Sequence, residues 1–415
     1  MSSPEREFDV IVWGATGFTG HLTSEYLLER YGLGQDLRWA IGGRSASKLE
    51  EVRLRLERDT GISTQSLPVI VANADEEESI RGLAARTAVV CTTVGPYALY
   101  GSHLVAACAR LGTHYCDLAG EVHWMRRMID AHDAAAQQSG ARVVFTCGFD
   151  CIPADLGTFF LQNEMKSRYG VAATEIKFRV KGFSGGASGG TIASMLNMLE
   201  EAGKDAEVMR IMNHPYSLNP KADRNGPDLP EPLVPAYDSD FGEWTAPFMM
   251  GAIDTKVGRR TNALLGHPYG RAFRYNEAVL TGEGPMGFAK ASGVAGGMGA
   301  VMLAMAVGPL RRLIAPRLPA PGEGPSKEAR EAGYFDIRLH ACHPETKIND
   351  LRAKVTGDRD PGYGATSKML AESAVCLALD GLESAPGIST PAAAMGELLL
   401  MRLQKNAGLS FSIES

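Results

Sequence analysis

The first third of the chain alternates short apolar runs with longer amphipathic stretches. Phe8–Trp13 has the composition of a buried strand, and Thr19–Arg30 has the spacing of the helix that follows it. Further strands are predicted at residues 37–41, 67–71, 88–92, 114–117 and 142–146. Strands that alternate with helices predict βαβ units, and therefore an α/β fold with a Rossmann-type, doubly wound parallel sheet.

The pattern changes after Gly148. Residues 175–180 alternate like a strand with one exposed face, and residues 213–240 are rich in Pro, Asn and Asp, which predicts an extended surface segment. This segment could act as a lid or as an interface arm. We therefore predict three parts: a Rossmann domain over residues 1–147, a second α+β domain over residues 148–364, and C-terminal helices over residues 365–415 that pack back on the first domain.

Composition and charge narrow the class of protein. The 415 residues are too many for one ordinary core, and the net charge of −6 argues against nucleic acid as a partner. Seven cysteines without a CxxC pair, and the absence of HExxH, give no metal site and no disulfide framework. The acidic N-terminus is unlike a signal peptide, so we expect a cytoplasmic protein.

A glycine motif lies between the first predicted strand and its helix. Gly14 permits a tight turn, Gly17 lets the backbone approach a pyrophosphate, and Gly20 lets the helix pack on the strand. The alternative is a turn that needs glycine only for its geometry. Because strand and helix flank the motif, we predict a dinucleotide site formed by Gly14, Ala15, Thr16, Gly17, Phe18, Thr19 and Gly20.

The residues after the second strand select the cofactor. An NAD-binding domain usually places an acid there to bind the ribose 2′-hydroxyl, whereas this chain has Arg44. A guanidinium can bind a 2′-phosphate, with Ser45 and Lys48 as additional donors. The alternative is that these cations only solvate the start of a helix. We predict NADPH (NADP) as the cofactor.

The remaining cofactor contacts are expected after the third and fourth strands. Asp75 could border the adenine or could simply charge a helix N-terminus. Thr93, Gly95 and Pro96 follow the fourth strand, at the edge where the nicotinamide should lie. Tyr97 is then either a residue at the reactive end or a packed aromatic beside a Gly-Pro turn.

These motifs together resemble the saccharopine dehydrogenase-like oxidoreductases, and the resemblance covers nearly the whole chain. It is carried by Gly14–Gly20, Gly43–Ser45, Thr93–Tyr97, Tyr115–Glu121, Cys147–Asp150, Ser184–Gly186, Gly189–Met195, Asp360–Tyr363 and Thr390–Gly396. Within that family the chain is most similar to the mycobacterial-type trans-acting enoyl reductases. The resemblance implies an NADPH-dependent reductase whose partner is an acyl or polyketide lipid intermediate, with a carrier-protein-bound form as one option.

Enoyl reduction needs a hydride, a donor to the developing enolate oxygen, and a proton for the α-carbon. Tyr97 and Tyr115 lie near the ends of the fourth and fifth strands, and Asp117 could orient one of them, so these three are the catalytic candidates. The alternative is that Tyr115 and Asp117 only connect strand to loop. No Tyr-x-x-x-Lys occurs in the chain, so the usual short-chain dehydrogenase relay is absent.

Two later segments bear on partners. Residues 291–310 carry no charge, and a buried helix is the first interpretation, followed by a membrane-surface or acyl-contacting helix. Residues 254–275 form a basic island that could receive an acidic carrier or a substrate phosphate, or could be a solvated face.

Two other functions stay open: a lipid-surface cofactor-binding protein with little catalysis, and an amino-acid or imine reductase. Peripheral membrane contact and a homodimer also stay open.

Overall fold

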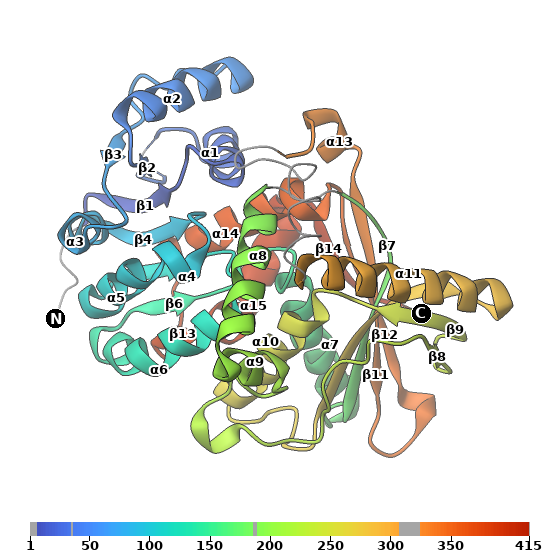
Figure 1. The fold of residues 1–415 in the computed structure, drawn as a ribbon. Helices are drawn as coiled ribbons and strands as arrows, with labels where there is room; N and C mark the ends of the chain where they lie inside the picture. The colour runs from blue at the N-terminus through green and yellow to red at the C-terminus, as the bar shows by residue number, and fades with distance from the viewer. Residues whose placement is uncertain (1–5, 35, 186–188, 307–323, 415) are drawn as a thin grey trace.

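The computed structural model describes residues 6–34, 36–185, 189–306 and 324–414, which form two seven-stranded sheets with helices around them (Figure 1). One sheet and its helices occupy the N-terminal side of the molecule, and the other sheet occupies the opposite side. Helices α7 (Ile152–Tyr169), α8 (Gly189–Lys204), α10 (Gly251–Leu264) and α15 (Pro391–Asn406) lie between the two.

The first sheet is parallel throughout, in the order β13-β6-β5-β4-β1-β2-β3. Helices cover both faces, which confirms the predicted Rossmann-type doubly wound fold. Its strands are β1 (Phe8–Trp13), β2 (Trp39–Gly43), β3 (Val69–Val71), β4 (Thr87–Thr92), β5 (His114–Cys116), β6 (Arg142–Val144) and β13 (Gly387–Ser389). Its helices are α1 (Phe18–Tyr31), α2 (Ala46–Thr60), α3 (Glu77–Ala85), α4 (Tyr97–Tyr100), α5 (Ser102–Leu111) and α6 (Val122–Ser139).

The second sheet is mixed, in the order β14-β12-β11-β7-β10-β9-β8, and only β7 and β10 pair in parallel. It confirms the expected α+β unit. Its strands are β7 (Glu175–Ser184), β8 (Ala236–Asp238), β9 (Glu243–Pro247), β10 (Arg274–Gly282), β11 (Tyr334–Cys342), β12 (Leu351–Gly357) and β14 (Leu409–Glu414). The associated helices are α7 (Ile152–Tyr169), α8 (Gly189–Lys204), α9 (Ala206–Asn213), α10 (Gly251–Leu264), α11 (Gly284–Ala306) and α13 (Lys327–Glu331).

The C-terminal segment contributes to both sheets. Helix α14 (Thr366–Leu379) packs against α1 and β4, and α15 (Pro391–Asn406) packs against α14 and α7. The buried Glu372 carboxylate accepts hydrogen bonds from Tyr26 and Tyr31 of α1 and from Arg402 of α15. Two strands that the sequence pattern did not indicate, β13 and β14, extend one sheet each. The segment therefore fixes the two units to one another.

The first interpretation of the uncharged residues 291–310, as a buried helix, is wrong for the part of α11 that the structure describes. Of the described side chains from Ala291 to Ala304, only Ala291 is buried, and Val301, Met302 and Leu303 are each about half exposed or more. The run is therefore not a core helix as far as the structure describes it, and residues 307–310 lie outside the described residues. No described helix is long and apolar enough to cross a membrane.

The basic island is also corrected, because its middle is buried. Arg259 binds Asp228 and Glu231, and Arg260 donates to main-chain carbonyl groups of Leu218 and Ile388. These arginines hold the extended segment before β8 against the second domain. These two arginines form neither a solvated face nor a binding site for a carrier, whereas Arg271 and Arg274, at the end of the island, are exposed.

Candidate active site at the carboxyl edge of the parallel sheet

The glycine loop after β1 has the geometry of a phosphate cradle. Gly14 has a φ of 94°, in the left-handed region that favours glycine, and its N–H and that of Ala15 donate to the Gly42 carbonyl. A Cβ at Gly20 would lie 2.2 Å from the Gly14 carbonyl oxygen, so the helix packs on the turn only without a side chain there. Thr93 Oγ1 donates to the same oxygen at 3.3 Å.

The N-terminus of α1 is open to an anion. Its first backbone hydrogen bond runs from His21 to Gly17, and neither a capping side chain nor an acid occupies the first turn. The N–H groups of Phe18 and Thr19 are therefore available, and the helix dipole favours a phosphate there. The residues present thus fit the pyrophosphate of a dinucleotide.

The residues of the glycine loop differ in whether their backbone or their side chain is available to a cofactor. The Ala15 side chain is fully buried, so Ala15 can contribute only backbone, whereas Thr16 is exposed. The Phe18 ring packs edge-on against Tyr363, with the Arg330 guanidinium 5.5 Å from its centroid. Phe18 therefore joins the loop to the second unit through its ring and can reach a phosphate through its N–H.

The end of β2 presents an arginine without a partner. Arg44 is exposed, and no described residue forms a hydrogen bond or an ion pair with its guanidinium. Ser45 caps α2 by accepting from the Lys48 N–H, and the Lys48 side chain is exposed. Asp75, also exposed, lies just before α3. The end of β2 thus offers cationic donors where a ribose 2′-substituent would lie.

The loop after β4 is held by a carboxylate that the sequence analysis gave no role. Glu121 is buried and accepts from the N–H groups of Tyr97 at 2.7 Å and Ala98 at 2.8 Å. The Ser194 hydroxyl of α8 bonds the same carboxyl group, whose pKa burial raises. Gly95 is exposed beside Ser194, since a Cβ on Gly95 would lie 3.5 Å from Ser194 Oγ. Helix α8 therefore closes over the predicted nicotinamide edge.

The two candidate tyrosines point inward. The Tyr97 hydroxyl donates to the Thr92 carbonyl at 3.3 Å and accepts from Leu118 N–H at 3.1 Å. The Tyr115 hydroxyl donates to Asp117 Oδ2 at 2.7 Å, and Tyr115 is fully buried. This geometry favours the packing interpretation for both tyrosines.

Asp117 organises the loops after β5 and β6. Its Oδ1 accepts from the N–H groups of Ala119 and Thr146, both at 3.0 Å. Burial raises its pKa to about 7, although these hydrogen bonds act in the opposite direction. The candidates Tyr97, Tyr115 and Asp117 do lie together, as a buried scaffold directly beneath the edge where Gly95 and Pro96 lie.

A second group of titratable side chains lies beside this edge and was not singled out from the sequence. Cys151, which precedes α7, donates to Asp254 Oδ1 at 3.3 Å, and Tyr275 donates to Glu277 Oε1 at 2.7 Å. Asp150 is the last residue of the Cys147–Asp150 motif, and the sequence indicated no role for its side chain. Asp254 and Glu277 lie on the consecutive elements α10 and β10, but Cys151 precedes Asp254 by 103 residues, so no local pattern could have joined this group.

A third cluster, of Asp240, His340 and Cys342, brings three potential metal ligands within 4.8 Å of one another. The Lys177 ammonium lies 2.6 Å from Asp240 Oδ2, and Lys347 lies 3.3 Å from Oδ1. These lysines already neutralise the carboxylate and lower the pKa of Asp240 to about 2. We therefore interpret the cluster as an ion-pair network.

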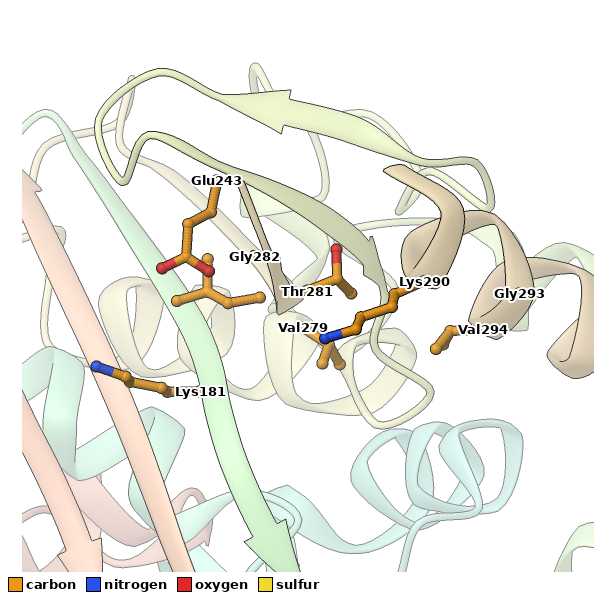
Figure 2. Close-up of a pocket in the computed structure, with 9 residues that line it drawn as sticks. Lys181, Glu243, Val279, Thr281, Gly282, Lys290, Gly293 and Val294 are labelled. Carbon is orange, nitrogen blue, oxygen red and sulfur yellow. The ribbon is translucent and has the colours of Figure 1, made fainter. Parts of the chain in front are cut away.

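A pocket of about 680 Å³ opens between β10 and α11 (Figure 2). Val279, Leu280 and Val294 provide apolar lining, and the Lys290 side chain reaches from α11 toward Val279 (Figure 2). Helix α8 packs against α11, which lines this pocket, and its Ser194 lies beside Gly95.

The comparisons with known proteins agree with this geometry. Residues 10–144 match the model of the saccharopine dehydrogenase NADP binding domain. The fold matches saccharopine dehydrogenase (L-Glu forming) of Saccharomyces cerevisiae with a TM-score of 0.53 and 11% identity, over 98% of this chain and 99% of that chain. At this identity the match shows a shared fold.

Several relatives match nearly the whole chain. A Mycobacterium tuberculosis H37Rv protein, provisionally named trans-acting enoyl reductase, is 42% identical over 99% of this chain and 98% of its own length. A trans-acting enoyl reductase of Mycobacterium ulcerans is 37% identical over 97% of both chains. The class is therefore that of NADP-dependent oxidoreductases, which confirms the predicted cofactor. More narrowly, the chain belongs to the trans-acting enoyl reductase family.

Proposed function

We propose that this protein is an NADPH-dependent, trans-acting enoyl reductase that saturates the carbon–carbon double bond of an acyl or polyketide thioester. The observation that carries the substrate class is the pocket beside α11: its volume of about 680 Å³ and its apolar residues Val279, Leu280 and Val294 suit an acyl chain, and Lys181, Glu243 and Lys290 add charged groups to its lining. The names of the relatives support the reaction type.

The chain's own residues would hold the cofactor along the carboxyl edge. The α1 N-terminus would bind the pyrophosphate, Arg44 would bind the 2′-phosphate, and Gly95 leaves room for a flat ring above β4. Bound NADPH supplies a hydride. Helix α8 would exclude water from that side, because its Ser194 bonds the Glu121 carboxylate that fixes the loop after β4.

The pocket would position the acyl chain and leave the thioester toward α8. No described residue pairs with the ammonium group of Lys290, so it is available to an anionic carrier or its phosphate linker. Val301, Met302 and Leu303 extend an uncharged surface from the pocket along α11. This surface supports a further part of the proposal, namely that α11 contacts lipid when the substrate is collected.

Steady-state oxidation of NADPH with enoyl thioesters of increasing chain length tests the proposal. We expect turnover with enoyl thioesters, and we expect Val279→Trp to raise KM for long chains while leaving the shortest chain unaffected. Ile348→Trp is the control, because Ile348 is 92% exposed and lies outside this pocket. Turnover only with an amino acid and an oxo acid would contradict the assignment, as would chain-length effects that are equal in both variants.

A further inference from the structure

Three carboxyl groups meet behind the carboxyl ends of β5 and β6, and none of them has a role in the binding of cofactor and substrate proposed for this protein. Asp150 lies in the turn between β6 and α7, Asp254 in the first turn of α10, and Glu277 on β10. The first turn of α10 packs on the active-site edge, because a Cβ at Gly120 would lie 3.0 Å from Ile253 Cδ1. Gly120 directly precedes the carboxylate that fixes the loop after β4.

Asp254 and Glu277 form a buried pair with one proton donor on each side. They are 2% and 4% exposed, and Cys151 and Tyr275 donate to them at 3.3 and 2.7 Å. Apart from the Asp254 carboxyl group, Glu277 Oε2 has no hydrogen-bond partner among the described residues. An acceptor left this way in the interior is costly unless a proton lies between the two carboxyl groups.

The charges around the pair favour that proton. Glu231 adds a further negative charge, and Arg259, a cation whose charge acts on Glu277, is held by Asp228 at 2.6 Å and by Glu231 at 3.1 Å. Burial raises the pKa of Glu277 to about 8, and burial together with the charges of Glu277 and Asp150 raises the pKa of Asp254 well above its usual value. The pair therefore retains a proton at neutral pH.

Asp150 differs from the pair because it is partly exposed. No described residue forms a hydrogen bond or an ion pair with its carboxylate, although it lies close enough to Asp254 to influence that group's ionisation. Burial raises its pKa to about 6. Asp150 therefore lies between the buried pair and the open edge at the carboxyl end of β6.

The geometry points to Asp150 as the acid that protonates the substrate α-carbon, with the Asp254–Glu277 pair as the store that returns a proton to it. This inference rests on the proposed function. Hydride addition to the β-carbon leaves an enolate, the Asp150 O–H bond breaks as the α-carbon C–H bond forms, and Asp150 becomes a carboxylate. A proton then passes from the pair to Asp150, and water restores the proton of the pair.

Four variants test this assignment with an enoyl thioester as substrate: Asp150→Asn, Asp254→Asn, Glu277→Gln and the control Glu397→Gln, an exposed carboxylate on α15. We expect Asp150→Asn to lower kcat by about 10²- to 10⁴-fold, the usual contribution of a general acid, with NADPH affinity unchanged. In D₂O the wild type should place solvent deuterium at the α-carbon.

The pair has its own signature in the pH profile. In the wild type, kcat should fall as pH rises through about 8, where the pair loses its proton. In Asp254→Asn and Glu277→Gln the fall should move toward about pH 6, where Asp150 alone would deprotonate. A purely structural role would lower kcat or stability without moving this limb.

The results distinguish failure of the proposed function from failure of the proton assignment alone. If the wild type oxidises no NADPH with any enoyl thioester, the proposed function fails, and this inference fails with it. If the wild type turns over and Asp150→Asn matches it in kcat and pH profile, only the proton assignment is overturned. Asp150→Glu guards against a folding defect: it keeps a carboxyl group and should retain much more activity than Asp150→Asn, and equal loss in both would contradict the assignment.

Discussion

At the scale of single residues, Arg44 is the clearest determinant of cofactor choice, because it is exposed and no described residue pairs with it. We expect Arg44→Ala to weaken NADPH binding by roughly 1.5–3 kcal/mol, the range for a hydrogen bond to a charged group. NADH binding should barely change, because NADH lacks the 2′-phosphate. Fluorescence titration with both cofactors measures this, and an equal loss for both would remove Arg44 from the phosphate site.

The buried carboxyl pair should also show in the pH dependence of stability. A carboxyl group whose pKa is raised in the folded state binds more protons there than in the unfolded chain, where its pKa is about 3.9–4.3. Native stability therefore falls as pH rises from that value through the folded pKa, near 8 for Glu277.

Asp254→Asn removes one of the two ionisations without removing volume. Its Tm relative to the wild type should therefore rise between pH 5 and pH 8. Thermal unfolding at both pH values measures this, with Glu397→Gln as the matched control because its carboxylate is exposed. A Tm difference that stays constant with pH would show that the pair carries no retained proton.

The sequence predicted the site residues that lie within a local motif and did not predict the others. The glycine loop and Arg44 follow strands β1 and β2, so strand and motif together placed them on one edge. The Glu121 carboxyl group bonds both the loop after β4 and Ser194 of α8, and Cys151 bonds Asp254 of the second unit. Such contacts exist only after tertiary packing, and one sequence contains no signal for them.

At the scale of elements, the turn from β1 into α1 separates two roles of glycine. A Cβ at Gly20 would lie 2.2 Å from the Gly14 carbonyl oxygen, whereas one at Gly17 would lie 3.3 Å from it. Gly20→Ala should therefore destabilise the protein itself, by about 1–3 kcal/mol as in other overpacked sites.

Gly17→Ala should leave the fold nearly unchanged and should weaken NADPH binding by more than about tenfold, or 1.4 kcal/mol, because the side chain faces the phosphate. Urea unfolding together with NADPH titration distinguishes the two variants. Normal cofactor affinity in Gly17→Ala would mean that the pyrophosphate does not approach this turn.

Most elements of the parallel sheet followed from alternating apolar and amphipathic segments, since the central strands β1, β2 and β4 are buried on both faces. Strand β13 has only three residues, Gly387–Ser389, and it becomes a strand because β6 is available to pair with it. The burial of α11 was predicted wrongly because an uncharged pattern shows that a helix avoids charge but does not show what covers it.

At the scale of the whole molecule, α11 gives the second unit an exposed apolar surface. If α11 contacts lipid, replacing Val301, Met302 and Leu303 together by Ser should reduce flotation with anionic lipid vesicles by at least about tenfold, since each buried side chain of this size contributes about 1.5–3 kcal/mol. Leu229→Ser is the control, because Leu229 is 80% exposed in a different segment. Unchanged flotation would exclude α11 as the contact.

The two units meet where the chemistry is proposed. Cys151 and Asp150 follow the parallel sheet, whereas Asp254 and Glu277 belong to the second unit, and Ser194 of α8 contacts the loop after β4. The hydride source and the proton source would thus come from different units, which the C-terminal segment holds together.

Isotope transfer shows directly whether this protein reduces an enoyl thioester with NADPH. NADPH deuterated at the transferable position of the nicotinamide is incubated with an enoyl thioester, and the product is analysed by mass spectrometry and NMR. We expect deuterium at the β-carbon of the saturated thioester and a solvent-derived hydrogen at the α-carbon. Binding of NADPH without any transfer to the thioester, across the range of chain lengths, would contradict it.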